Sequence, residues 1–408
     1  MTRRRIIGIG AVLVAVAITL GMAFGFVGGP AVAGPSSSAR ASSGGVLGAV
    51  GSAGTTTRPV PGHEVFGFVP YWEMNGDIAA HVAGTDLSTL ALFSVTNTRT
   101  GAIDTKQLGY KRITGQVGAQ LIRESRARGM KVQLVFSSLG TARNDRLFGS
   151  VPIQDATIAA VVALARKIGV DGVDIDVEQL RVELVGPYGA FVGRFRDELR
   201  AAIPGASVSV ATTSGLTGAA MALAAVHSGA DRVFLMAYDY HTGTTEVGAS
   251  APMARRDGAI QDLPWSLDLY AATGVPVGQT ILGLPLYGTR WRVEGPELGA
   301  PRLGDGAIWV PADNPRFLTN PPSPPEVDPI EIVDHYAVSP TVSPVPGDSR
   351  AAAGWQAIYV DSPATLTPKL ALADERGLAG AGFWAIGYER GLPGYGALIT
   401  AFAAGKLD

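Results

Sequence analysis

The sequence predicts an α/β chain folded as a (β/α)8 TIM barrel, with a small Pro-rich insertion between its seventh and eighth strands. Two observations carry this prediction. Apolar, β-rich runs alternate with helical segments along most of the chain, and they do so eight times. Such alternation is typical of a parallel sheet covered by helices, and eight repeats favour a closed barrel. A doubly wound open sheet is the alternative, but no glycine-rich phosphate fingerprint follows the first strand.

The elements follow one another in regular order. The predicted strands are 64–71, 89–97, 131–138, 170–178, 206–213, 232–240, 279–288 and 380–388. Helical periodicity is found at 113–129, about 154–168, 188–203, 215–229, 264–274, 362–377 and about 393–405. The insertion covers about 289–361 and contains the Pro-rich stretch "NPPSPPEVDP". We expect it to form one wall beside the carboxyl ends of the strands.

The N-terminal part predicts export. "MTRRR" is followed by an apolar run to Val27, and "AVA" at 31–33 offers a cleavage pattern, so 1–33 is a signal peptide or a membrane anchor. Residues 34–63 are rich in Gly, Ser, Ala and Thr and are expected to form a flexible linker. The catalytic-size barrel then occupies 64–408. We expect a secreted protein, or one held on the outer face of the cytoplasmic membrane.

Composition excludes several function classes. The chain of 408 residues has no cysteine, which rules out disulfides, thiolate metal sites and cysteine nucleophiles. With a net charge of −2 and only 17% of charged residues, the chain lacks the excess of basic residues that is typical of nucleic-acid-binding proteins. We expect no nucleic-acid partner, no cofactor and a monomer.

One strand carries an unusual row of acids. In "GVDGVDIDVEQL" (169–180), Asp174, Asp176 and Glu178 alternate with aliphatic residues, so the acids share one strand face, spaced by about 6.6 Å. In a barrel the aliphatic face packs on the helices, and the acids point inward with Glu178 nearest the carboxyl rim. Burying like charges together raises at least one pKa, as a general acid near neutral pH requires.

Two other uses of the acid row stay open at this point. A calcium loop would need Gly at its sixth position and a later terminal Glu, whereas Gln179 follows Glu178 in a strand-like run. A divalent-metal site would need ligands from other strands, because no His lies nearby in sequence. We predict no metal.

The acid row resembles the D-x-x-D-x-D-x-E signature of glycoside hydrolase family 18, the chitinase-like family, in "DGVDIDVE" (171–178). Further segments resemble the family's strands in order: "FGFVPYW" (66–72), "FLMAYDYH" (234–241), "ILGLPLYGTRW" (281–291) and "GAGFWAIGYE" (380–389). The resemblance covers nearly all of 64–405. It departs at "FSSLG" (136–140), where the family often has S-x-G-G.

The resemblance implies substrate-assisted catalysis, in which the sugar's 2-acetamido group attacks the anomeric carbon. Glu178 would be the general acid and then the base, and Asp176 would orient the acetamido N–H. Asp174 would share a proton with Asp176, and Tyr238 would hold the acetamido oxygen. Asp171, at the start of the strand, is expected to be structural.

The resemblance and the rim positions also suggest substrate-binding residues. Met236 and Asp239 match pocket-lining positions, and Trp384 matches the indole beneath the cleaved sugar. Aromatic residues expected at the rim as sugar platforms are Tyr71, Trp72, Tyr287 and Trp291. His241 is expected in the wall of the cleft.

The function so predicted is an exported glycosidase that hydrolyses β-1,4 linkages of N-acetylglucosamine-containing polysaccharides or oligosaccharides. Chitin, chitooligosaccharides and peptidoglycan all remain candidate substrates. A non-catalytic glycan-binding lectin of the same family is the alternative, since a fold does not prove activity. A structural protein at the cell surface is a third class, supported only by the N-terminal segment.

Overall fold

We describe the protein from a computed structural model, which covers residues 62–340 and 354–407. The predicted signal or anchor segment and all but the end of the predicted linker lie outside the described residues. Their export role therefore stays a prediction from sequence.

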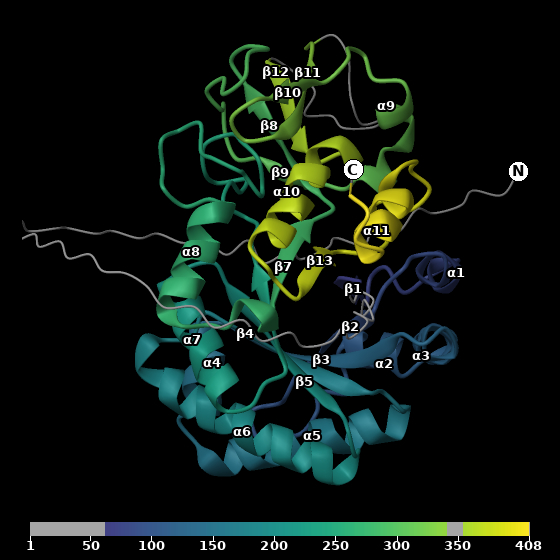
Figure 1. Cartoon of the computed structure of the whole chain (residues 1–408), viewed down its shortest axis with the longest axis vertical. Coiled ribbons are helices and arrows are strands. Elements are labelled where there is room, and N and C mark those ends of the chain that lie inside the picture. Colours follow the sequence, from purple (N-terminus) through teal and green to yellow (C-terminus); the bar gives the residue numbers. More distant parts are fainter. Residues whose placement is uncertain (1–61, 341–353, 408) are drawn as a thin grey trace, which may run out of the picture. The chain divides into compact units, whose positions relative to one another are not determined.

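Eight parallel strands close into a barrel in the order β1-β13-β7-β6-β5-β4-β3-β2, which confirms the predicted fold class (Figure 1). The strands are β1 (Glu64–Pro70), β2 (Thr89–Val95), β3 (Lys131–Leu139), β4 (Gly172–Glu178), β5 (Ser207–Thr213), β6 (Arg232–Met236), β7 (Thr280–Pro285) and β13 (Gly380–Trp384). Each strand thus lies beside its neighbour in sequence, and β13 closes the barrel against β1.

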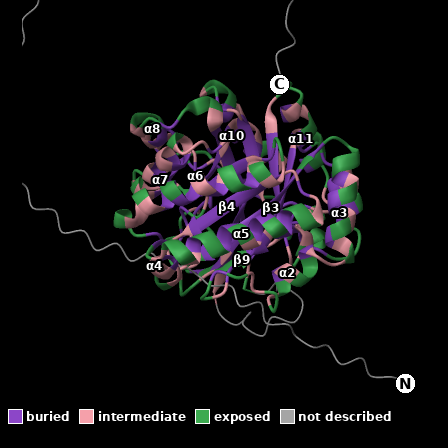
Figure 2. Ribbon diagram, turned by 90° about the horizontal axis from the view of Figure 1, so that it is seen from below, coloured by how far each residue is buried: buried purple, intermediate pink, exposed green. Residues whose placement is uncertain are grey.

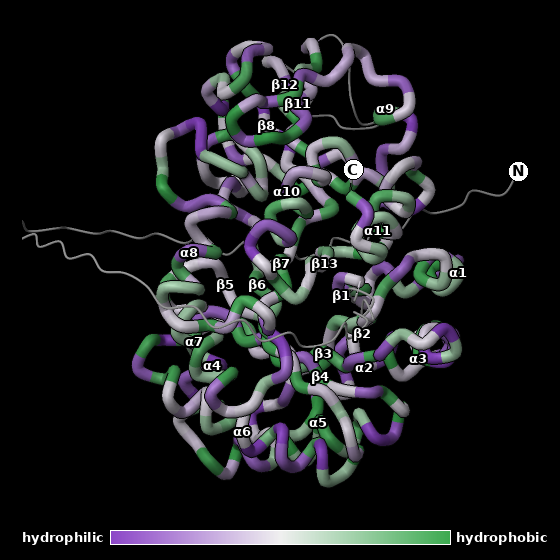
Figure 3. Tube along the Cα trace, viewed as in Figure 1, coloured by the Kyte–Doolittle hydropathy of each residue, from purple (hydrophilic) through white to green (hydrophobic). Residues whose placement is uncertain are grey.

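Helices cover the outside of the barrel. They are α1 (Ile78–Ala83), α2 (Leu108–Ile113), α3 (Gln116–Ala127), α4 (Thr141–Phe148), α5 (Val151–Ile168), α6 (Val185–Ala202), α7 (Leu216–His227), α8 (Leu263–Thr273), α10 (Pro363–Glu375) and α11 (Tyr395–Ala403). Figure 2 shows β3 and β4 buried behind α5, whose outer surface is exposed. Figure 3 shows that hydrophilic and hydrophobic residues alternate along the helices. In α5 the apolar residues Ile158, Val161 and Ala165 are buried, so the apolar side of this helix faces the strands.

The insertion forms a second sheet, between β7 and β13 in sequence. Its five strands run in the order β10-β11-β12-β8-β9 and are antiparallel, at the top of Figure 1. They are β8 (Gly288–Val293), β9 (Ala307–Trp309), β10 (Glu326–Asp328), β11 (Val333–Val338) and β12 (Trp355–Val360), with the short helix α9 (Pro315–Thr319) between β9 and β10. The sheet encloses small hydrophobic clusters of its own.

Several strands end earlier than the sequence pattern predicts. β6 stops at Met236, where the Ala237 N–H turns back to bond the Leu235 backbone oxygen at 2.8 Å, and Asp239 beyond it has a left-handed backbone with φ 61°. The predicted seventh strand divides into β7 and β8, and the eighth stops at Trp384. Apolar residues continue past these ends, so periodicity overestimates the strands at the rim where side chains turn toward a site.

A short helix, α4, was not predicted. It follows β3 directly, and Gly140, at φ 99°, supplies the left-handed backbone of the junction. The departure "FSSLG" from the family pattern lies at this junction. β3 continues through Leu139 before the chain turns, and Gly140 N–H bonds the backbone oxygen of Glu178 at 3.3 Å.

The interior of the barrel is filled by aromatic and small residues. Phe66, Phe68 and Phe234 pack on one another, with ring centroids 4.8 to 5.7 Å apart. Gly283 and Gly382 flank Phe234: a Cβ on either would lie 2.5 or 2.6 Å from the ring of Phe234. Glycine at these positions lets one large ring plug the barrel, leaving the carboxyl rim above it for the polar side chains.

Across residues 62–340 and 354–407, no single helix is long and apolar enough to cross a membrane. The helices α4 and α5 reach the required length and hydropathy only as a pair, bent by 99° at their break. Residues spaced along α5, including Ile158, Val161 and Ala165, are buried in the main core.

Candidate active site

The acid row of β4 points into the barrel. Val173, Ile175 and Val177 lie in the core formed with the helices. Asp174 instead accepts a hydrogen bond from Ser209 Oγ of β5 at 2.6 Å, on the inner face. Asp176 is buried above it, and Glu178, the last residue of β4, is half-buried. The strand period therefore places three carboxyl groups in line from the barrel interior to its rim.

The two deeper carboxyl groups share a poorly solvated space. Asp174 Oδ2 and Asp176 Oδ1 are buried without a hydrogen-bond partner among the described residues. Burial raises the pKa of Asp174 to about 7, and the hydrogen bond from Ser209 opposes this rise. Burial, followed by repulsion from Glu178 and from Asp174, raises the pKa of Asp176 well above its usual range. Two adjacent groups of this kind retain a proton between them near neutral pH.

Glu178 has the properties of a general acid. Loss of water, followed by repulsion from Asp239, raises the pKa of its carboxyl group. Its backbone is fixed from α4, since Asn144 Nδ2 donates to the Glu178 backbone oxygen at 2.5 Å. Ser138 Oγ in turn donates to Asn144 Oδ1 at 2.7 Å. These contacts therefore fix the strand end that carries Glu178. The raised pKa means that its carboxyl group keeps its proton to higher pH than an ordinary glutamate does.

Tyr238, Asp239 and Tyr287 lie in the segments that follow β6 and β7, and Tyr238 is close enough to the acid row to be affected by its charges. The Tyr238 and Tyr287 rings meet edge to face at 6.2 Å, and the Tyr287 hydroxyl donates to Asp239 Oδ1. Burial and the negative charges of Asp239 and Glu178 raise the pKa of Tyr238, so its hydroxyl stays a donor. The Asp239 residue as a whole is exposed, but its carboxyl group is surrounded by protein, and this burial raises the pKa of the group. The hydrogen bond from Tyr287 opposes the rise.

Predicted aromatic platforms gather at the end of β1 and β13. Trp384 is half-buried, held edge to face by Phe93 at 4.7 Å and tilted against Phe68 at 5.7 Å. Trp72 is 38% exposed, and its Nε1 donates to Tyr388 Oη at 3.0 Å. Their remaining surface is available to stack on a sugar ring.

Tyr71 and Met236 are half-buried members of the same rim. Tyr71 packs edge to face on Trp72 at 4.9 Å. Met236, at the end of β6, contacts the barrel-interior cluster.

Three predicted positions are corrected. Tyr287, expected as a sugar platform at the rim, is only 4% exposed, and its hydroxyl bonds Asp239. Trp291 is 1% exposed and lies in the core of the five-stranded sheet against Tyr359, so it offers no face to a sugar. His241 is likewise buried and is not in the cleft wall. Its Nε2 contacts Glu331 Oε1 at 3.1 Å, and its Nδ1 contacts the backbone oxygen of Glu246 at 2.8 Å. His241 ties the loop after β6 to the insertion, a contact that no local sequence pattern reveals.

Sequence reasoning missed the polar residues that hold the site. Asn144 of α4 and Ser209 of β5 lie in none of the motifs quoted above. Tyr388 lies in "GAGFWAIGYE" (380–389), but its side chain was not singled out there. Ser250 was missed as well; its hydroxyl accepts from the Asp239 backbone N–H at 3.1 Å. Asp171 takes the structural place expected of it, accepting from Val132 N–H at 3.0 Å and pairing with Arg126.

The arrangement suits proton transfer to an oxygen above the barrel. Among residues 62–340 and 354–407, no three His, Asp or Glu side chains come together as a metal-binding group. The site offers instead a protonatable carboxyl group at the rim, a buried carboxyl pair beside it and a Tyr hydroxyl donor opposite. Such a set can protonate a leaving group and balance a positive charge that develops nearby.

Known structures share this architecture. A family 18 chitinase from Cycas revoluta, in complex with (GlcNAc)4, is similar at TM-score 0.67 and 17% identity, covering 85% of this chain and 100% of that one. The spore cortex-lytic enzyme SleL of Bacillus cereus is similar at TM-score 0.62 and 17% identity, covering 83% of this chain and 74% of that one. At these identities the similarity concerns the fold.

Curated relatives match over shorter stretches. Chitotriosidase-1 of Mus musculus is 30% identical over 124 residues, which is 28% of this chain and 25% of the mouse protein. Nod factor hydrolase protein 1 of Medicago truncatula is 25% identical over 274 residues, 61% of this chain and 67% of that protein. The sequence model of glycosyl hydrolases family 18 matches residues 65–389, the whole span from β1 to the segment after β13. With its acid row on β4 and this match over most of its length, the chain belongs to glycoside hydrolase family 18.

Proposed function

We propose that this protein is an exported enzyme that hydrolyses β-1,4 linkages in N-acetylglucosamine-containing glycans, with the substrate's acetamido group as nucleophile. The observation that carries the proposal is the raised pKa of Glu178 at the rim, next to the buried pair of Asp174 and Asp176. Glu178 acts as general acid toward the glycosidic oxygen and then as base toward water. Asp176 accepts the acetamido N–H and balances the charge on the oxazolinium ion.

The geometry does not favour a protein carboxylate as nucleophile. A retaining enzyme of that type needs its second carboxyl group across the sugar from the acid, at about 5–5.5 Å. Asp176 shares a strand face with Glu178, and Asp239 is engaged by Tyr287. In this proposal the Tyr238 hydroxyl, which burial keeps protonated, holds the acetamido oxygen for attack.

The test is hydrolysis of chitotetraose with NMR observation of the first anomer released. We expect the β-anomer first, and cellotetraose, which lacks the acetamido group, should be essentially untouched. Peptidoglycan strands assayed alongside show which glycan is preferred. Inverted products, or comparable rates on cellotetraose, would contradict the mechanism. Binding of chitotetraose with no cleavage would support the lectin alternative instead.

We also propose that the chain works outside the cytoplasm, on the strength of its N-terminal pattern. Mass spectrometry of the protein from expressing cells should find either a new N-terminus after Ala33 or the intact chain in the membrane fraction. The intact chain recovered in the cytoplasm would contradict export. Removal of residues 1–58 should leave hydrolysis of chitotetraose unchanged, because every residue of the proposed site lies beyond this segment.

A further inference from the structure

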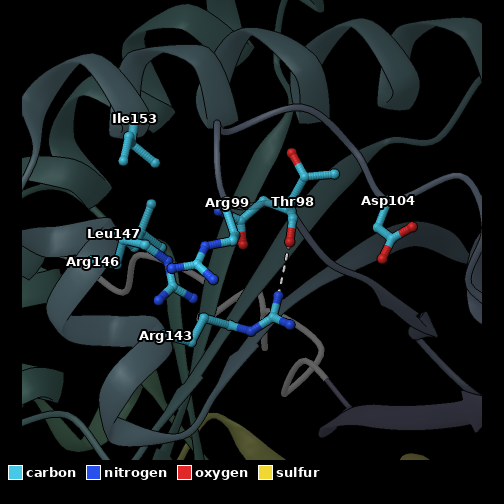
Figure 4. A pocket seen from close by; sticks show the side chains of 8 residues that line it. Thr98, Arg99, Asp104, Arg143, Arg146, Leu147 and Ile153 are labelled. Atoms are coloured by element: carbon cyan, nitrogen blue, oxygen red, sulfur yellow. Dashed lines mark hydrogen bonds between the residues drawn. The ribbon is translucent and has the colours of Figure 1, made fainter.

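A cationic pocket opens beside the active site, between the segment after β2 and helix α4 (Figure 4). It has a volume of about 250 Å³. Arg99, Arg143 and Arg146 line it together with a single acid, Asp104, which gives a formal charge of +2. In a chain whose net charge is −2, such a concentration of positive charge is local to this place. Figure 4 shows the three arginines gathered together and Asp104 apart from them.

Among residues 62–340 and 354–407, no acidic side chain forms an ion pair with these three arginines. Arg143 Nη1 is used to hold the segment after β2, by donating to Thr96 Oγ1 and, at 2.8 Å, to the Asn97 backbone oxygen. Within the described part of the chain, no ion pair or hydrogen bond engages the side chains of Arg99 and Arg146. Burial, followed by repulsion from Arg146, lowers the pKa of the Arg143 guanidinium, and attraction to Asp104 opposes this effect. An anion bound here would relieve that repulsion.

Asn97 is a buried part of the pocket wall. It is 5% exposed, and its Oδ1 has almost no accessible surface and no hydrogen-bond partner among the described residues. Thr157 Oγ1 donates to the Ile153 backbone oxygen at 2.8 Å and accepts from Asn97 Nδ2 at 3.3 Å. Asn97 therefore shapes the wall, and the arginines supply the charged groups that a ligand can reach. Leu147 and Ile153 supply apolar contact.

The pocket lies next to the chemistry. Arg143 and Arg146 stand on α4, whose Asn144 holds the backbone of Glu178. Thr98 and Arg99 follow the end of β2, at the same carboxyl rim. Leu139, which pairs with Glu178 across β3 and β4, is 46% exposed and gives an apolar surface at the level of Glu178. A glycan crossing Glu178 toward β2 would place a neighbouring sugar at the arginines.

We propose that this pocket binds a carboxylate carried by a sugar next to the cleaved bond, so that the preferred substrate is an acidic N-acetylated glycan rather than neutral chitin. The proposal rests on the proposed function for its substrate class. Two sources supply the chemistry: the lactyl ether of N-acetylmuramic acid, as in peptidoglycan strands, or a uronic acid that alternates with N-acetylglucosamine. In both, the carboxylate is carried by a sugar that neighbours an N-acetylglucosamine unit, as contact with the arginines requires.

The experiment measures binding separately from hydrolysis. The full chain carrying Glu178→Gln is titrated calorimetrically with chitotetraose, with a peptide-free tetrasaccharide of N-acetylglucosamine and N-acetylmuramic acid, and with a hyaluronan tetrasaccharide. We expect at least one acidic ligand to bind more tightly than chitotetraose, by about tenfold or more, the range of a charge-assisted hydrogen bond. Whichever acidic glycan binds more tightly identifies the source of the carboxylate.

The variant to add is Arg146→Gln, because Arg143 also holds the segment after β2. It should remove the preference for the acidic ligand and leave chitotetraose binding within about twofold, since one charge-assisted bond is lost. Arg128→Gln, an exposed arginine at the C-terminal end of α3, is the matched control and should change neither. Reduction of the ligand carboxylates to alcohols should mimic Arg146→Gln.

The outcomes separate the two proposals. Equal binding of acidic and neutral ligands, or equal losses for both in Arg146→Gln, would overturn the pocket assignment. A wild-type chain that binds acidic glycans through Arg146 but hydrolyses none would leave the pocket standing and refute the proposed catalysis. If the chain hydrolyses chitotetraose but Arg146→Gln changes the binding of no acidic ligand, the proposed catalysis stands and the pocket assignment is refuted.

Discussion

Glu178→Gln is expected to abolish hydrolysis of chitotetraose while leaving its binding nearly intact. The amide retains the size of the side chain and the backbone contact with Asn144, but it has no proton to transfer to the glycosidic oxygen. General acid–base catalysis contributes about 10²–10⁴-fold, so kcat should fall by at least about a hundredfold. Steady-state kinetics measure kcat, and calorimetric titration of the variant measures the dissociation constant.

The pH profile gives a second readout of the same residue. Burial and Asp239 raise the pKa of Glu178, so the acid form persists to higher pH than for an ordinary glutamate. In the wild type, kcat/KM should fall as pH rises through this raised pKa, since the proton needed by the leaving group is lost. Residual activity of Glu178→Gln should not follow that alkaline limb.

A matched control lies five residues further along the chain. Glu183 is an exposed carboxylate in the short 3-10 helix Val182–Leu184, and Glu183→Gln makes the same chemical change outside the site. It should keep wild-type rates and the wild-type pH profile. Turnover of Glu178→Gln within about tenfold of wild type would be too small a loss for a general acid and would reject the assignment.

The barrel and its acid row could be predicted because both follow from local periodicity. The alternation of 173–178 decides which side chains enter the barrel, and each strand pairs with the next in sequence. What lies beyond the strand ends could not be predicted in this way. Tyr238 and Asp239 lie beyond the end of β6, and Asp239 has a left-handed backbone. The alternation of a strand therefore does not predict the direction in which their side chains point.

Residues fixed by contacts distant in sequence were the ones misjudged. Trp291 ends the segment "ILGLPLYGTRW", which resembles the family's seventh strand, but it belongs to β8, where it fills the core of the insertion. His241 is explained only by Glu331, which lies 90 positions later and accepts from the Ala249 backbone N–H at 2.6 Å as well. The cationic pocket likewise joins Arg99 to Arg146 across two elements. The spacing of residues along the sequence does not predict such tertiary contacts.

The second large effect concerns Asp176. In substrate-assisted catalysis, positive charge grows on the acetamido nitrogen as the oxazolinium ion forms, and a buried carboxylate beside it stabilises that charge. Asp176 is buried, with Oδ1 unpartnered among the described residues and Asp174 below it to take the shared proton. Asp176→Asn keeps the shape but cannot become negative. We therefore expect kcat on chitotetraose to fall by about 10²–10³-fold, as for loss of one preorganised electrostatic group.

Asp171→Asn, one residue before β4, is the matched control. Asp171 lies at the opposite end of the barrel, where it bonds Val132 N–H and pairs with Arg126, so its loss should lower thermal stability while leaving kcat near wild type. A thiazoline mimic of the cyclic intermediate then separates the charge effect from simple misfolding. Asp176→Asn should bind this mimic far more weakly than wild type does, yet bind intact chitotetraose almost as well, because only the mimic carries the charged ring. Equal losses for both ligands, or a kcat close to that of wild type, would mean that Asp176 does not balance the charge on the oxazolinium ion, and would refute its assigned role.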